Sequence, residues 1–196
     1  MVWKECWQGR ASGRLTMSLV TPVSVEKLRK ALHAKAKASP EFRFYQLYDK
    51  LYRWDVLVHA YCRCRANGGA AGVDGGTFEQ IAQGGERAWL EALARTLRAK
   101  TYEPAPVRRV WIPKENGKQR PLGIPTIRDR VVQTAAVLVL EPSFEADLQP
   151  EQYAYREGHR AQDAVRQVHG LIRSGYDEVV DADLSGYFDT IPHAEL

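Results

Sequence analysis

The sequence predicts an α+β fold that is rich in helices and contains one β-hairpin. Apolar residues recur at three-to-four spacing through most of the first hundred residues, which is typical of amphipathic helices. Two strand-like runs, residues 107–112 and 119–124, then flank Asn116-Gly117, a dipeptide that favours a hairpin turn. Further helical patterns follow, and a short apolar run at residues 179–184 is typical of a buried strand.

Two helices are expected before residue 68. The first covers residues 25–38 with Ser24 as its N-cap, and the second is a long helix over residues 40–67. The aromatic and apolar stripe of the second helix favours burial in a core. Contact with RNA is the alternative, because basic residues alternate with the aromatics; these are Lys50, Arg53, Arg63 and Arg65.

Glycines and caps mark the next segment. Residues 67–76 form a glycine-rich loop, which lacks the Gly-Lys-Ser/Thr ending of a phosphate-binding P-loop. Thr77 and Gln80 predict a capping box for a helix that is interrupted at Gly84-Gly85 and then resumes. This loop is therefore expected to connect helices.

The register of the hairpin decides which cations share a face. With a three-residue loop and Gly117 in the left-handed conformation, Lys114 and Arg120 lie on one face with Ile112. A two-residue loop would place Lys114 and Arg120 on opposite faces. We expect the three-residue loop.

Two more helices are expected after the hairpin. Thr126 caps the first, which carries Asp129 in its first turn and ends at Glu141-Pro142. The second covers residues 161–174. Each is expected to bury one apolar stripe, formed by Ile127, Val131, Ala135, Leu138 and Val139 in the first and by Ala164, Val165, Val168, Leu171 and Ile172 in the second.

Acidic residues accompany the predicted strand at 179–184. Because strand side chains alternate, Asp181 and Asp183 project to one side, and Val180, Ala182 and Leu184 project to the other. Carboxylates placed in this way suit a hard cation such as Mg²⁺. A two-metal site needs carboxylates from more than one strand, so this strand accounts for only half of such a site.

Charge and composition favour a protein that contacts phosphate groups and disfavour a membrane protein or a zinc-binding protein. Residues 101–130 contain seven Lys or Arg against three acidic residues, an excess equal to the +4 net charge of the whole chain. A local basic stripe favours phosphate contact. No apolar run approaches the roughly 18 residues of a membrane span, so we expect a cytoplasmic protein without membrane contact. Cys62 and Cys64 lie about 200° apart on a helix, which disfavours a shared zinc ion.

Several ordered blocks occur along the chain: Gly72-Val73-Asp74-Gly75, residues 112–126, 129–133 and 153–159, and Asp183-x-x-x-Tyr187-Phe188-Asp189. Together they resemble the reverse transcriptase/maturases encoded by group II introns. The resemblance covers roughly residues 45–196. It implies helix-rich fingers with a β-hairpin, followed by the first strand of a right-hand polymerase palm. The implied divisions are an N-terminal extension (1–40), the fingers (41–175) and the start of the palm (176–196).

The resemblance also implies roles for individual residues. Lys114 and Arg120 would contact the triphosphate of an incoming dNTP, and Phe188 would pack against its sugar. Asp183 would be the first catalytic, metal-binding aspartate, with the backbone carbonyl of Leu184 beside the same Mg²⁺ ions.

A further block would contact the RNA template. Arg156, Gly158 and Arg160 occupy the positions that contact the template, paired with a DNA primer, in the family. The chain departs from the common family pattern at Glu157, His159 and Arg160. Group II intron RNA is the other partner that the resemblance implies.

The second palm motif of the family, which contains two adjacent aspartates, does not occur in these 196 residues. We therefore expect that this chain alone does not polymerise DNA. Two alternatives remain: an RNA-binding, maturase-type fragment without catalysis, and a truncated reading frame without function. In the second alternative, Val179, Val180 and Leu184 would lie exposed on an unpaired strand edge.

Overall fold

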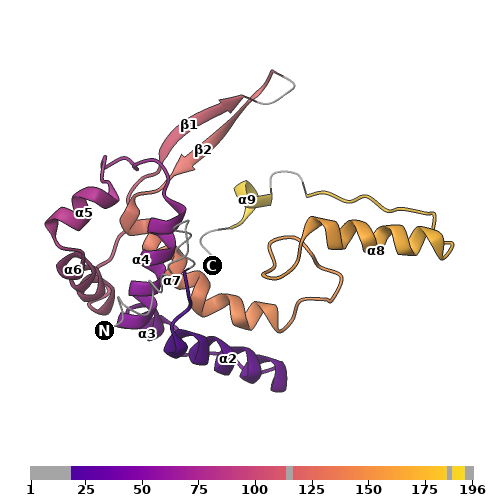
Figure 1. The fold of residues 1–196 in the computed structure, drawn as a ribbon, viewed down its shortest axis with the longest axis horizontal. Coiled ribbons are helices and arrows are strands. Elements are labelled where there is room, and N and C mark those ends of the chain that lie inside the picture. Colours follow the sequence, from indigo (N-terminus) through magenta and orange to yellow (C-terminus); the bar gives the residue numbers. More distant parts are fainter. Residues whose placement is uncertain (1–18, 114–116, 185–186, 193–196) are drawn as a thin grey trace, which may run out of the picture. The chain divides into compact units, whose positions relative to one another are not determined.

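The computed structural model divides the chain into two compact units, with the boundary between Leu148 and Gln149. Among the described residues, the first unit contains helices and a hairpin, and the second contains the helices α8 (Ala161–Arg173) and α9 (Tyr187–Thr190) (Figure 1). The described residues are 19–113, 117–184 and 187–192, without the side chains of Phe188 and Asp189.

The described part of the first unit combines helices with a two-stranded antiparallel sheet, as the predicted α+β class requires. In chain order its elements are α2 (Val23–Ala38), α3 (Tyr48–Leu51), α4 (Trp54–Asn67), α5 (Phe78–Gly84), α6 (Glu86–Arg98), β1 (Arg108–Pro113), β2 (Gln119–Ile124) and α7 (Ile127–Glu145).

Helix α4 forms the centre of the core of the first unit. It packs along α7, and α2 and α6 also contact this pair. Residues 56–62 are buried on every side of α4, which is typical of a core helix. Burial is therefore confirmed for this part of the aromatic stripe. The five residues predicted for the buried stripe of α7 are all buried as well.

The capping box at the start of α5 is confirmed. The Thr77 backbone N–H donates to the Gln80 side chain (2.9 Å), and the Gln80 N–H donates to the Thr77 hydroxyl (3.3 Å). Gly85, with φ +94°, separates α5 from α6 as the sequence predicted. A positive φ of this size favours glycine.

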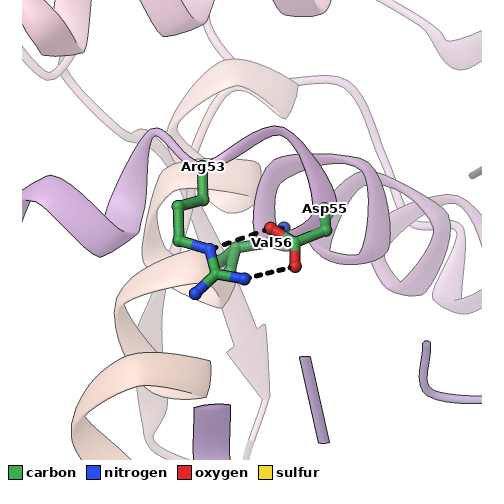
Figure 2. Close-up of polar contacts among 3 residues, drawn as sticks. All are labelled: Arg53, Asp55 and Val56. Carbon is green, nitrogen blue, oxygen red and sulfur yellow. Dashed lines mark hydrogen bonds and ion pairs between the residues drawn. The ribbon is translucent and has the colours of Figure 1, made fainter. Parts of the chain in front are cut away.

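The predicted long helix over residues 40–67 is wrong. Residues 42–47 have no regular structure, and the short α3 ends before Arg53, whose backbone is extended. Figure 2 shows the reason: the Asp55 carboxylate accepts two hydrogen bonds from the Arg53 guanidinium (3.1 and 2.7 Å) and one from the Val56 N–H (3.1 Å). These bonds compete with helical continuation at this corner.

Two predicted helix ends also differ. Helix α2 begins at Val23 after Pro22, so Ser24 lies inside the first turn, where it hydrogen bonds to Asp55 instead of capping. Helix α7 continues past Pro142 to Glu145 although proline removes a helical hydrogen bond.

Contacts with α2 hold the last turn of α7. An ion pair joins Arg29 to Glu141 (2.7 Å), and Lys37 donates to the Ala146 carbonyl (3.1 Å). Pro142 is itself buried. Packing between the two helices therefore outweighs the local cost of the proline.

The second unit contains α8 (Ala161–Arg173) and α9 (Tyr187–Thr190). Helix α8 begins at the predicted residue and ends at Arg173, one residue before the predicted end, and Gly175 follows at φ +95°. Its apolar stripe, however, is not buried. Ala164 is half-buried, and the larger stripe residues are exposed; these are Val165, Val168, Leu171 and Ile172. Apolar periodicity predicts that a helix has an apolar face. Burial of that face also needs a second element that packs against it.

The predicted strand at residues 179–184 is also wrong. This segment has no regular structure, and Val180, expected in a core, is 93% exposed. A strand forms by hydrogen bonding to a neighbour, and β1 and β2 are the only strands among the described residues. Val179 and Leu184 are exposed as well.

Neither a membrane helix nor a metal-binding cluster of His, Cys, Asp and Glu occurs in the described ranges. Cys62 and Cys64 are both buried in α4, and the Cys64 sulfur lies 3.2 Å from the Thr134 hydroxyl. Burial raises the pKa of the Cys64 thiol, which keeps it protonated. The two cysteines therefore belong to the core.

Candidate nucleotide and nucleic-acid interface

The hairpin presents two chemically different faces. Ile112 pairs with Arg120, which is the register expected from a three-residue loop, and Gly117 has the predicted left-handed conformation (φ +76°). Arg120 therefore shares a face with Ile112. Arg109 and Trp111 lie on the opposite face because side chains alternate along a strand.

Most of the hairpin is exposed to solvent. Figure 1 shows the two strands extending beyond the helices of their unit. Arg108, Arg109, Lys118 and Arg120 are all exposed, and Trp111 is 54% exposed. The predicted partner Lys114 lies outside the described residues. The described hairpin thus offers cations on a surface where an anionic ligand has access.

The base of the hairpin is anchored by one buried carboxylate. Asp129, in the first turn of α7, is 2% exposed and accepts hydrogen bonds from the Tyr102 hydroxyl (2.5 Å) and the Thr126 hydroxyl (2.6 Å). It also accepts one from the Ala105 N–H (3.3 Å), and its own N–H donates to Thr126 (3.1 Å). These bonds join the chain entering β1 to the chain leaving β2.

Electrostatics at this anchor keep Tyr102 neutral. Burial and the hydrogen bond to Asp129 raise the pKa of the Tyr102 hydroxyl, so it remains a donor at neutral pH. The Arg128 guanidinium lies 5.0 Å from the centre of the Tyr102 ring and donates to Thr96 (3.3 Å). The hairpin base is therefore tied to α6 and α7.

The glycine-rich loop supports the same junction. A Cβ atom on Gly72 would lie 2.7 Å from the Thr126 Cα, a backbone atom that cannot easily move. Arg130 donates to the Gly68 carbonyl (3.1 Å) and to the Ala70 carbonyl (2.8 Å). Close backbone packing against the start of α7 thus explains Gly72, the first residue of the Gly-Val-Asp-Gly block.

The predicted template block forms a tight turn in the second unit. Arg156 donates to the carbonyls of Gln149 (2.8 Å) and Gln152 (3.4 Å), and Gly158 has φ +81°. Arg160 precedes α8, where its N–H donates to the Asp163 carboxylate (3.1 Å). The Asp163 N–H, which a serine hydroxyl at position 160 would accept, donates instead to the Arg160 carbonyl (2.9 Å).

The predicted metal residues lie in irregular chain. Asp183 and Leu184 are exposed, as is Asp181. Phe188 falls within α9, but its side chain is outside the described set. The described structure therefore places Asp183 on an accessible segment and does not bring it together with a second carboxylate ligand.

Comparison with known proteins identifies the family. A sequence profile described as reverse transcriptase (RNA-dependent DNA polymerase) matches residues 112–196. The group II intron-encoded protein LtrA of Lactococcus lactis is 32% identical over 154 residues, which is 78% of this chain. This chain belongs to the group II intron reverse transcriptase/maturase family.

Other relatives extend the same result. Protein YkfC of Escherichia coli is 34% identical over 180 residues, 88% of this chain. A putative COX1/OXI3 intron 1 protein of Saccharomyces cerevisiae is 29% identical over 139 residues, 71% of this chain. The chain spans 46% of YkfC, 25% of LtrA and 16% of the yeast protein, so it covers less than half of each relative.

Sequence reasoning about this group II intron reverse transcriptase/maturase chain missed the anchoring role of Asp129. The Thr126-x-x-Asp129 spacing predicted a cap, and that cap is present. The additional bonds from Tyr102 and Ala105 join segments 24 or more residues apart, which local spacing does not reveal. Helical periodicity gives no signal for this burial, because Asp129 lies about 200° from Ile127 around α7, away from the apolar stripe.

Proposed function

We propose that this chain forms the fingers and the start of the palm of an RNA-directed DNA polymerase. The observation that carries the proposal is the anchored hairpin, in which Arg120 shares a face with Ile112 and the base is fixed by Asp129. A triphosphate-binding element needs cations on an accessible but firmly based support. Family membership supplies the substrate class, a deoxynucleoside triphosphate.

Arg120 and Lys114 bind the triphosphate of the incoming nucleotide. The Arg120 guanidinium offers a planar fork that matches two phosphate oxygens, and the Lys114 ammonium adds a compact charge. Phe188 packs against the sugar. A rigid aromatic ring in that place discriminates sugars by bulk at the 2′ position.

Mg²⁺ is the cofactor, as it generally is in reverse transcriptases. The donors of this chain fit it in kind, because the Asp183 carboxylate and the Leu184 carbonyl both offer the oxygen atoms that Mg²⁺ prefers. When bound, the ions stabilise charge on the attacking and leaving oxygens of phosphoryl transfer. Asp183 is the catalytic, metal-binding residue that this chain supplies.

Arg156, Gly158 and Arg160 contact the RNA template, which is paired with a DNA primer. Exposure of Gly158 and Arg160 supports access of a nucleic-acid backbone to this turn. Arg156 also positions the turn through its bonds to two carbonyls. Glycine allows close approach of a ribose-phosphate chain.

These 196 residues alone do not extend a primer. Two-metal transfer needs carboxylates from more than one segment, and the sequence contains no pair of adjacent aspartates. An RNA-templated primer-extension assay on the purified chain should therefore give no product above a protein-free control. Extension above that control would contradict this part of the proposal.

Binding of intron RNA tests the proposal as a whole. The chain and its Lys114→Ala/Arg120→Ala variant are titrated with a structured group II intron RNA and with an unrelated RNA of equal length, across a salt series. We expect the unaltered chain to bind the intron RNA tightly and selectively, with an affinity that falls as the salt concentration rises. Weak and equal binding of both RNAs would contradict a working reverse transcriptase/maturase fragment.

A further inference from the structure

A second basic site lies away from the hairpin, in a hollow of about 370 Å³ between the α3–α4 corner and α6. The volume falls at the lower end of the range for ligand sites, roughly 300–1,000 Å³. Its lining combines arginines with aromatic rings. The lining residues are Tyr52, Arg53, Trp54, Glu91, Ala94, Arg95 and Arg98.

Positive charge dominates this hollow. Three guanidinium groups face one carboxylate, Glu91, and that carboxylate already pairs with Arg87 (2.8 Å). Arg95 and Arg98 are exposed, lie one turn apart on the same side of α6, and pair with no carboxylate among the described residues. Two cations therefore remain available to an anion.

The corner that carries the third arginine is held in place before any ligand arrives. The Asp55 carboxylate accepts hydrogen bonds from two nitrogens of Arg53 and from the Val56 N–H (Figure 2). Ser24 also hydrogen bonds to Asp55. This ion pair is the same contact that breaks the predicted long helix. Breaking the helix here turns Tyr52, Arg53 and Trp54 toward the hollow.

Aromatic rings supply the second half of the site. Tyr52 and Trp54 are half-buried and both line the hollow. The Arg98 guanidinium lies 5.4 Å from the centre of the Tyr52 ring, so a cation and a flat apolar surface occur together. A ligand that matches both has a phosphate next to a planar base.

We propose that this hollow binds one nucleotide of single-stranded RNA, with Arg95 and Arg98 on the phosphate and the base against Tyr52 and Trp54. The inference rests on the proposed RNA-binding function and adds a site outside the hairpin and the template turn. Single-stranded RNA is favoured over a duplex because a base must be unstacked to reach the rings.

The test uses a fluorescent decaadenylate and an abasic ribose-phosphate chain of the same length. The unaltered chain is compared with Arg95→Ala/Arg98→Ala and with the control Arg166→Ala/Arg173→Ala, which removes the same charge from α8. We expect the hollow variant to bind decaadenylate about tenfold more weakly and to lower the salt slope by about 0.7, the value for loss of one phosphate contact in a single strand. The control should change affinity by less than about twofold, because Arg166 and Arg173 do not line the hollow.

Base recognition gives the second arm of the test. The unaltered chain should bind decaadenylate at least about fivefold more tightly than the abasic chain, as stacking on an aromatic ring predicts. Equal affinity for the two probes, or an equal loss in the α8 control, would overturn the inference. If the hollow variant loses affinity for RNA but keeps its affinity for dGTP, the hollow and the hairpin are separate sites. If the unaltered chain binds no RNA, both this inference and the proposed function are overturned.

Discussion

The hydroxyl of Tyr102 donates a 2.5 Å hydrogen bond to the carboxylate of Asp129, which links the chain entering the hairpin to the helix that follows it. Thr126 and Ala105 donate to the same carboxylate. The base of the solvent-exposed hairpin is thereby held by hydrogen bonds to the buried Asp129 carboxylate, both oxygens of which accept hydrogen bonds. The orientation of the hairpin face that carries Arg120 depends on this anchor.

Removing the anchor should destabilise the first unit. Asp129→Ala leaves three buried or half-buried donors without their acceptor, and at about 1 kcal/mol each the free energy of unfolding should fall by about 3 kcal/mol. Urea unfolding followed by circular dichroism measures the change. The exposed Glu103→Ala is the control, and a midpoint for Asp129→Ala equal to that of the control would contradict the anchoring role.

Gly72 should not tolerate a side chain. Gly72→Ala places a Cβ atom 2.7 Å from the Thr126 backbone, and relieving such overlap should cost about 1–3 kcal/mol of stability. Gly84→Ala is the matched control, because a Cβ atom there meets nothing within 4 Å. Thermal unfolding of both variants decides the point, and equal melting temperatures would show that the loop does not pack as described.

Acid should selectively weaken the α3–α4 corner. Burial acts to raise the pKa of Asp55, but hydrogen bonds from Arg53 and Ser24, the charge of Arg53 and the Val56 N–H outweigh it, so the pKa lies below the usual 3.8. A lowered folded-state pKa means that the stabilisation is present above pH 3.8 and is lost as pH falls through the folded value.

The Asp55→Asn variant isolates this effect. At pH 7 the unaltered chain should melt at a higher temperature than Asp55→Asn, and the difference should shrink as the pH falls below 3.8. Melting curves at a series of pH values between neutral and strongly acid test this. A difference that stays constant over the whole series would exclude a contribution from ionised Asp55.

Local patterns predicted those parts of the fold that local forces decide. The hairpin register followed from strand alternation and from the left-handed Gly117, and the cap of α5 followed from Thr77 and Gln80. The break at Arg53 was missed because a side-chain ion pair, which apolar periodicity does not report, replaces the helical bonds.

Contacts between residues distant in sequence explain the remaining differences between the predicted and the observed fold. Helix α7 passes through Pro142 because α2 holds its end, and no local pattern reveals that neighbour. The apolar face of α8 and the segment at 179–184 were predicted to be buried, but both needed partners that the described residues do not provide. The roles assigned to Lys114 and Arg120 in nucleotide binding, and to Asp183 in metal binding, remain predictions.

The most direct test of the nucleotide-binding claim compares two arginines of one hairpin. Arg120→Ala and Arg109→Ala remove the same charge from exposed positions, but the register places them on opposite faces. Binding of a fluorescent dGTP analogue in the presence of Mg²⁺ is measured for both variants, with the corresponding monophosphate as competitor. The account predicts that Arg120→Ala weakens triphosphate binding about tenfold or more, as loss of a charge-assisted phosphate contact should, and that Arg109→Ala leaves it nearly unchanged. Equal losses in the two variants would contradict a nucleotide-binding face.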